Sequence, residues 1–226
     1  MAGERGQLKQ RFDLIIFDLD GTLIDSRVDL ANSVNHTRLQ MGLSSLPPEL
    51  IFTYIGDGAA MLVQRALGEG VQEEGVKAAL TIFMDHYKQH LLDHTGLYPD
   101  VANTLSSLSH LRLAVLSNKP VGPSTTILEG LQVRDQFVRI YGGDSFEQKK
   151  PHPMGIEQIL KDTGITKERA LMVGDSRIDV TTGQNAGVAT CGVTYGLASD
   201  TLRGLNPNFL IHQFSKLISV LNTSDH

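Results

Sequence analysis

Two aspartates one residue apart, Asp18 and Asp20, follow directly on the apolar run of residues 14–17. Side chains two apart on a strand point the same way, so both carboxylates can address one site while the residue between them faces the core. Gly21 permits a tight turn after them, and Thr22 adds a hydroxyl and an N–H close by. Carboxylates do not stabilise a buried strand, and two like charges this close together repel each other. The pair therefore predicts a bound ligand or a part in a reaction.

Three further groups of polar residues stand where predicted strands end. They are Ser117 and Asn118, then Lys149 and Lys150, and then Asp175 and Asp179. Each group alone has an ordinary structural interpretation as a strand-end turn, a solvated lysine or a helix cap. The carboxyl ends of parallel strands meet at one edge of the sheet, which is where ligands bind in open α/β folds. Four such groups on four strand ends therefore favour one shared site.

The residue types at this predicted site indicate which ligands it would hold. The four carboxylates form an all-oxygen set of hard ligands, which suits Mg²⁺ together with waters and substrate oxygens. They belong to Asp18, Asp20, Asp175 and Asp179. The hydroxyl of Ser117, the amide of Asn118 and one of the two lysines suit a phosphate.

The elements that must position these residues alternate between strand and helix. Near-continuous apolar runs predict strands over residues 12–18, 111–118, 137–143, 169–176, 187–196 and 206–211, each covered on both faces. Helix-like segments lie between them at 122–131, 152–164 and 177–187. The alternation predicts an α/β fold with a Rossmann-like parallel sheet.

Residues 26 to about 95 break this alternation, because only helical patterns are present there. We expect an all-helical insert after the first strand, with Ser26 as the N-cap of its first helix and Asp29 in the first turn. The predicted division is a core domain of residues 1–24 and 96–226 and a helical domain of residues 25–95.

Composition narrows the class of protein. The chain has 226 residues, a formal net charge of -5 and one cysteine, Cys191. The negative charge disfavours nucleic-acid partners, and a lone cysteine excludes an intramolecular disulfide framework. The first ten residues are polar, and no apolar run approaches the roughly 20 residues of a membrane span. We therefore expect a cytoplasmic protein, monomeric or homodimeric, with no membrane or nucleic-acid partner.

With these motifs in place, the sequence resembles the haloacid dehalogenase superfamily of phosphotransferases. The motifs are Asp18-Leu19-Asp20-Gly21-Thr22, Ser117-Asn118, Lys150-Pro151 and Gly174-Asp175-Ser176-Arg177-Ile178-Asp179. They occur in the expected order, and the insert resembles the family's C1 cap. The phosphoglycolate phosphatase group is the most similar, through Gly56-Asp57-Gly58-Ala59 and the stretch Leu97-Tyr98-Pro99-Asp100-Val101. At the cap exit that group usually has Pro-Gly-Val, and this chain has Pro99-Asp100-Val101.

The resemblance implies a role for each site residue. Asp18 would be the nucleophile that becomes an aspartyl-phosphate, and Asp20 would be the acid and base for the leaving group and the water. Mg²⁺ would be bound by Asp18, Asp175, the backbone carbonyl of Asp20, and Asp179 directly or through water. Ser117 and Lys150 would hold phosphoryl oxygens, with Asn118 as a further donor.

We accordingly predict a Mg²⁺-dependent phosphatase that acts on a small phosphorylated metabolite, with 2-phosphoglycolate as one candidate. A sugar phosphomutase of the same fold is the alternative, and a catalytically silent binding protein is a third. Residues 54–59 are either the cap's specificity loop or a turn between helices. Arg65 either meets a substrate carboxylate or lies on the surface. Ser26 and residues 95–99 are the expected hinges.

Overall fold

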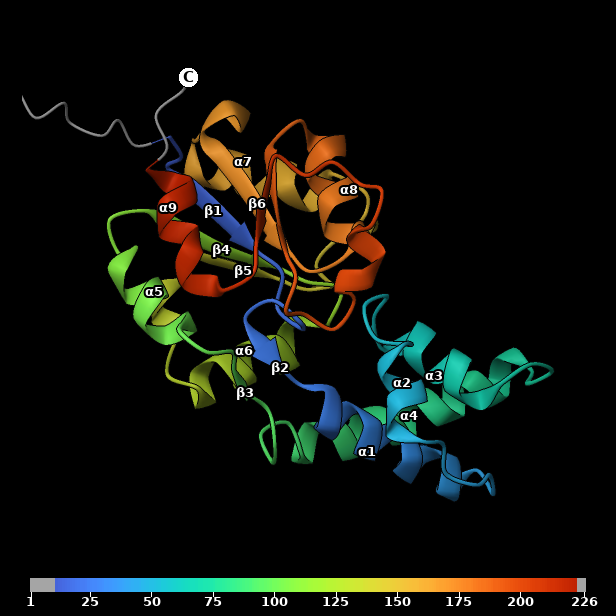
Figure 1. Cartoon of the computed structure of the whole chain (residues 1–226). Helices are drawn as coiled ribbons and strands as arrows, with labels where there is room; N and C mark the ends of the chain where they lie inside the picture. Colours follow the sequence, from blue (N-terminus) through green and yellow to red (C-terminus); the bar gives the residue numbers. More distant parts are fainter. Residues whose placement is uncertain (1–10, 223–226) are drawn as a thin grey trace, which may run out of the picture.

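The computed structural model describes residues 11–222, so the polar start of the chain at residues 1–10 lies outside the described part. A six-stranded sheet in the order β5-β4-β1-β6-β7-β8 forms its centre, and every neighbouring pair of strands is parallel (Figure 1). The strands are β1 (Leu14–Phe17), β4 (Arg112–Leu116), β5 (Arg139–Tyr141), β6 (Ala170–Gly174), β7 (Ala189–Val193) and β8 (Phe209–Ile211). The predicted α/β, Rossmann-like fold is confirmed.

All six strands are shorter than predicted, although the backbone N–H groups of Asp18 and Ser117 still donate to the carbonyl oxygens of Val173 and Tyr141 on the neighbouring strands. β1 ends at Phe17, one residue before Asp18, and β4 ends just before Ser117. At the last strand the side chain of Asn208 accepts a hydrogen bond of 2.9 Å from the backbone N–H of Thr190. This side-chain bond takes the place of ladder pairing at the start of the predicted strand.

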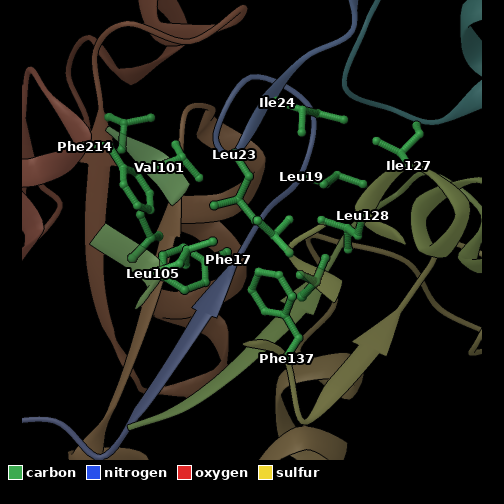
Figure 2. Close-up of a cluster of buried hydrophobic side chains, with 14 of the residues drawn as sticks. Phe17, Leu19, Leu23, Ile24, Val101, Leu105, Ile127, Leu128, Phe137 and Phe214 are labelled. Atoms are coloured by element: carbon green, nitrogen blue, oxygen red, sulfur yellow. The ribbon is translucent and has the colours of Figure 1, made fainter. Parts of the chain in front are cut away.

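Helices cover both faces of the sheet (Figure 1). They are α5 (Val101–Ser107), α6 (Val121–Gly130), α7 (Met154–Thr163), α8 (Arg177–Ala186) and α9 (Leu217–Leu221). Alternate residues of β1 face opposite layers: Ile15 and Phe17 belong to the larger hydrophobic cluster, and Leu14 and Ile16 belong to the smaller one with residues of α7. Figure 2 shows Phe17 surrounded by side chains from several elements of the larger cluster. A strand buried on both faces reads as a continuous apolar run, as β1 does.

The helical insert consists of four helices that lie beyond the carboxyl edge of the sheet (Figure 1). They are α1 (Arg27–Gln40), α2 (Pro48–Phe52), α3 (Ala59–Leu67) and α4 (Glu73–Gln89). Two short strands, β2 (Ile24–Asp25) and β3 (Gly96–Leu97), pair antiparallel where the chain leaves and re-enters the core. The pattern did not predict these two strands or α5 and α9. Within residues 11–222, no helix has both the length and the apolar character needed to cross a membrane.

The predicted capping role of Ser26 is wrong in its chemistry. Ser26 stands at the N-cap position of α1 but makes no side-chain cap bond. Its hydroxyl donates to Asp20 instead, at 2.5 Å. Asp29 is buried in the first turn and accepts hydrogen bonds from the backbone N–H groups of His94 and Thr95. Asp29 therefore links the start of the insert to its end by hydrogen bonds.

Candidate active site

The loop after β1 places Asp18 and Asp20 at the carboxyl edge of the sheet, between β4 and β6. The carbonyl oxygen of Leu19 accepts hydrogen bonds from three successive N–H groups, those of residues 22 to 24. Gly21 has φ 85°, and a Cβ there would lie 2.3 Å from a carboxylate oxygen of Asp175. The turn predicted at Gly21 therefore needs glycine for two reasons, its backbone conformation and its closeness to Asp175.

Lys150 forms ion pairs with two of the predicted carboxylates. Its Nζ lies 2.8 Å from Oδ1 of Asp18 and 2.6 Å from Oδ1 of Asp179, and its side chain is 3% exposed. Burial would lower the pKa of Lys150, but Asp179 and Asp18 raise it, so the lysine is a buried ammonium. The neighbouring Lys149, which residue types alone did not distinguish from Lys150, is exposed.

Asp18, Asp175 and Asp179 form a compact acidic cluster, in which one carboxylate oxygen of each lies within 4.8 Å of the other two. Burial and the charge of Asp179 raise the pKa of Asp18 to about 7. Burial, Asp179 and Asp18 likewise raise the pKa of Asp175 well above its ordinary value. Lys150 forms ion pairs with Asp18 and Asp179, so the three carboxylates together carry more negative charge than its single ammonium neutralises when all three are ionised. This donor set fits a hard divalent cation.

Asp179 also caps the N-terminus of α8. Its Oδ2 accepts hydrogen bonds from the backbone N–H and the hydroxyl of Ser176, which completes a capping box. Asp179 is thus an acid in the first turn of α8, as its structural interpretation predicted, while the N-cap is Ser176 and not Asp175. The other oxygen is held toward Lys150, so the cap also fixes the carboxylate in the cluster.

The side chain of Asp20 does not belong to the acidic cluster. Both of its oxygens lie 3.0 Å from Nζ of Lys119, and Oδ1 also accepts the hydrogen bond from Ser26. Burial would lower the pKa of Lys119, but Asp20 and Tyr87 raise it. Asp18 and Asp20 thus face different partners, although they stand two residues apart.

Asn118 organises its surroundings by means of its side-chain amide. Its Oδ1 accepts from the backbone N–H of Lys150 at 3.1 Å, and its Nδ2 donates to the carbonyl groups of Lys150 and Gly56. Asn118 therefore joins β4, the Lys150 segment and the insert. The hydroxyl of Ser117 accepts from the backbone N–H of Lys119 and lines the same cavity as Asp18.

A cavity of about 40 Å³ separates the sheet edge from the insert. Its core side includes Asp18, Asp20, Ser117, Asn118 and Lys119. Its insert side is lined by Leu30, Ile55, Gly56, Gly58, Ala59, Leu62, Phe83, Met84 and Tyr87. A water molecule needs roughly 10–15 Å³ by this measure, so the space suits a ligand of a few atoms.

The segment 54–59 reaches this cavity, and Arg65 does not line it. Arg65 pairs with Asp57 at 2.5 Å and donates to the carbonyl oxygen of Tyr54 at 3.1 Å. Arg65 thus braces the loop from outside. The structure does not bring it to the cavity where a substrate carboxylate would be expected.

Comparisons with known proteins agree with this architecture. Residues 15–193 match the family described as "Haloacid dehalogenase-like hydrolase". The chain belongs to this family. The predicted family and the hydrolase class are therefore confirmed.

Relatives in this hydrolase family match over nearly their whole length. The chain is 35% identical over 218 residues to a Colwellia psychrerythraea protein named phosphoglycolate phosphatase, covering 92% of this chain and 96% of the relative. It is 36% identical over 224 residues to a Haemophilus influenzae protein of that name, covering 95% and 100%. A crystal structure described as "a predicted phosphoglycolate phosphatase from haemophilus somnus 129pt" has a TM-score of 0.88 and 32% identity, with 94% and 99% covered.

Two residues of this family member's site were missed from the sequence. Lys119 directly follows the Ser117-Asn118 pair, and its proximity was the one signal that could have found it. Tyr87 belongs to a helical run whose apolar spacing is typical of a core helix, so nothing in the sequence separated it from its neighbours. Ser26 was predicted as a helix cap, whereas its hydroxyl donates to Asp20.

Proposed function

We propose that this protein is a Mg²⁺-dependent phosphatase that hydrolyses a small phosphorylated metabolite through an aspartyl-phosphate on Asp18. The supporting observation is the position of Asp18, which lies beside Lys150 and in the acidic cluster, and also lines the small cavity. The names of the relatives make 2-phosphoglycolate the leading candidate substrate.

Asp18, Asp175 and Asp179 would hold the metal ion, because these buried carboxylates exceed the positive charge that Lys150 supplies. The predicted fourth contact, from the backbone carbonyl of Asp20, is part of the same proposal. Bound Mg²⁺ would supply Lewis-acid neutralisation of charge between the phosphate and the carboxylates.

The residues of the chain would divide the chemistry between them. An oxygen of Asp18 attacks phosphorus, and the bond from phosphorus to the leaving oxygen breaks. Asp20 gives a proton to that oxygen, and it later takes one from the water that attacks phosphorus and releases Asp18. Lys150 and Ser117 face the charge that grows on the phosphoryl oxygens. Asn118 would contribute mainly by positioning Lys150, because its amide is already bonded to that segment.

The helical insert would act as a lid over the reaction. We propose the division into a core of residues 1–24 and 96–226 and a cap of residues 25–95, with the paired strands β2 and β3 as the hinge. The cap side of the cavity is largely apolar, which excludes water and strengthens electrostatic interactions inside. The 54–59 loop, which lines the insert side of the cavity, would contact and select the leaving group.

Phosphate release tests this proposal directly. The panel contains 2-phosphoglycolate, several sugar phosphates and an aryl phosphate, each with Mg²⁺ or with EDTA. We expect Mg²⁺-dependent release that Asp18→Asn abolishes and that the exposed-site control Asp200→Asn retains. Full activity in EDTA or in Asp18→Asn would overturn the proposal, and isomerised sugar phosphate without free phosphate would favour the mutase instead.

A further inference from the structure

The segment 195–198, which follows β7, packs against the carboxylate of Asp175. We infer that this segment positions Asp175 for the metal ion, and that Gly196 and Tyr195 are the positioning residues. The inference rests on the proposed function, because it concerns how the chain would hold the Mg²⁺ that the proposed reaction uses. It goes beyond that function, because it gives a role to residues that neither line the cavity nor belong to the acidic cluster.

Gly196 lies between Asp175 and the loop that follows β1. A Cβ at this position would lie 2.2 Å from Cβ of Asp175 and 2.3 Å from the backbone oxygen of Gly21. The φ angle of Gly196 is not positive, so glycine is needed here for space and not for its backbone conformation. A side chain at this position would have to displace Asp175 or the Gly21 backbone, because neither contact is the end of a flexible side chain.

The backbone N–H of Ala198 orients the same carboxylate. It donates to Oδ2 of Asp175 at 2.8 Å, and Asp175 is buried. Outer hydrogen bonds of this kind fix the direction of carboxylates that bind a metal ion. The 195–198 segment therefore restrains Asp175 in two ways, through the close approach of Gly196 and through this hydrogen bond.

Tyr195 connects the segment to the loop after β1 and to the hinge. Its hydroxyl donates to the backbone oxygen of Thr22 at 3.0 Å. Its ring packs against the ring of Tyr98, with 4.9 Å between the ring centres. The backbone N–H of Tyr98 in turn donates to the carbonyl oxygen of Leu23 at 3.0 Å. Two successive carbonyl groups of the loop are therefore held by two tyrosines that contact each other.

Together these contacts fix the two sides of the proposed metal site relative to each other. Asp175 directly follows β6, and the carbonyl group of Asp20, the proposed fourth contact, lies on the loop that Tyr195 holds. Mg²⁺ requires nearly ideal octahedral coordination, with oxygen ligands at about 2.0–2.1 Å. A small displacement of either side should therefore weaken Mg²⁺ binding.

Binding of Mg²⁺ to two variants tests this role without depending on turnover. The dissociation constant of Mg²⁺ is measured by calorimetry on full-length protein that circular dichroism shows to be folded. Gly196→Ala should weaken Mg²⁺ binding by about 10- to 100-fold, which is the usual effect of changing the outer partners of metal ligands. Tyr195→Phe removes one hydroxyl and should weaken Mg²⁺ binding by about 2- to 10-fold.

Each variant has a matched control that separates this role from a structural one. A Cβ at Gly122 would meet no atom within 4 Å, so Gly122→Ala should leave the dissociation constant of Mg²⁺ unchanged. Tyr141→Phe removes a hydroxyl that donates to Asp162 at 2.5 Å, and it should also leave this constant unchanged.

The inference is overturned if the wild type binds no Mg²⁺, or if either variant at the 195–198 segment binds it as tightly as the wild type. If Gly196→Ala does not fold, an unchanged dissociation constant in Tyr195→Phe overturns it. Absence of phosphate release from a wild type that binds Mg²⁺ would count against the proposed function alone, since the binding comparison needs no catalysis.

Discussion

Replacing the proposed nucleophile should stabilise the metal-free protein while it abolishes activity. Asp18 is a buried carboxyl next to Asp179, and its pKa is raised from 3.8 to about 7. A raised pKa in the folded state means that the charged form destabilises folding, because the unfolded chain ionises the same group more easily. Asp18→Asn keeps the size and an acceptor for Lys150 but removes this charge.

The expected gain follows from the pKa difference. One pKa unit corresponds to about 1.4 kcal/mol, so a change from 3.8 to about 7 corresponds to about 4 kcal/mol at pH 8. The wild type loses this stability as the pH rises from 3.8 to about 7, so the advantage of Asp18→Asn should be less than half as large at pH 5 as at pH 8. Titration shared with Asp175 and Asp179 reduces the gain, and we expect about 2–4 kcal/mol at pH 8.

Urea unfolding in EDTA at pH 5 and pH 8 measures this difference. Asp200→Asn is the matched control, because Asp200 is exposed, and it should change the free energy of unfolding by less than about 0.5 kcal/mol. Phosphate release by Asp18→Asn should fall by roughly 10³-fold or more. A variant that is less stable than the wild type at pH 8, or a gain that does not grow with pH, would refute the electrostatic account of the cluster.

Three other predictions concern the surroundings of the site. A Cβ at Gly174 would lie 2.2 Å from Cβ of Asp179, so Gly174→Ala should cost about 1–3 kcal/mol in urea unfolding and should lower Mg²⁺-dependent activity. Ser26→Ala removes the hydroxyl that donates to Asp20 and should lower kcat by about 10- to 100-fold with little change in melting temperature; an unchanged kcat would exclude that contact from catalysis. Burial lowers the pKa of His86 in the folded protein, so as the pH falls the unfolded chain binds a proton at this residue before the folded protein does. The free energy of unfolding should therefore decrease as the pH drops below 6.5. The urea midpoint of His86→Gln should fall less between pH 7.5 and 5.5, and equal falls would contradict this cause.

The arrangement of the sheet could be predicted because its strands are buried on both faces. Runs such as residues 14–17 and 170–174 are apolar throughout, and the polar residues that follow them mark the sheet edge. β2 and β3 have two residues each, which is too short for a periodic pattern. α5 begins at Val101, directly after Asp100, whose backbone is left-handed with φ 66°. Short elements depend on tertiary contacts more than on local sequence.

The candidate site residues were predicted because they follow predicted strands along the chain, and the structure brings Asp18, Lys150 and Asp179 into contact. Lys119 could not be found in the same way, since a lysine after a strand is usually solvated and its burial arises from the insert packed above it. The partner of Ser26 was mistaken for a similar reason. A serine before a helix is commonly a cap, and only the folded chain brings Asp20 within reach of its hydroxyl.

The most direct test of the account is to trap the covalent intermediate. Enzyme, Mg²⁺ and 2-phosphoglycolate are mixed, quenched in acid within milliseconds and treated with borohydride, which reduces an acyl phosphate to an alcohol. Peptide mass spectrometry should then find homoserine at position 18, in an amount that depends on substrate and is absent from Asp18→Asn protein. Rapid phosphate release with unmodified aspartate at position 18, or with homoserine at position 20 instead, would contradict the account.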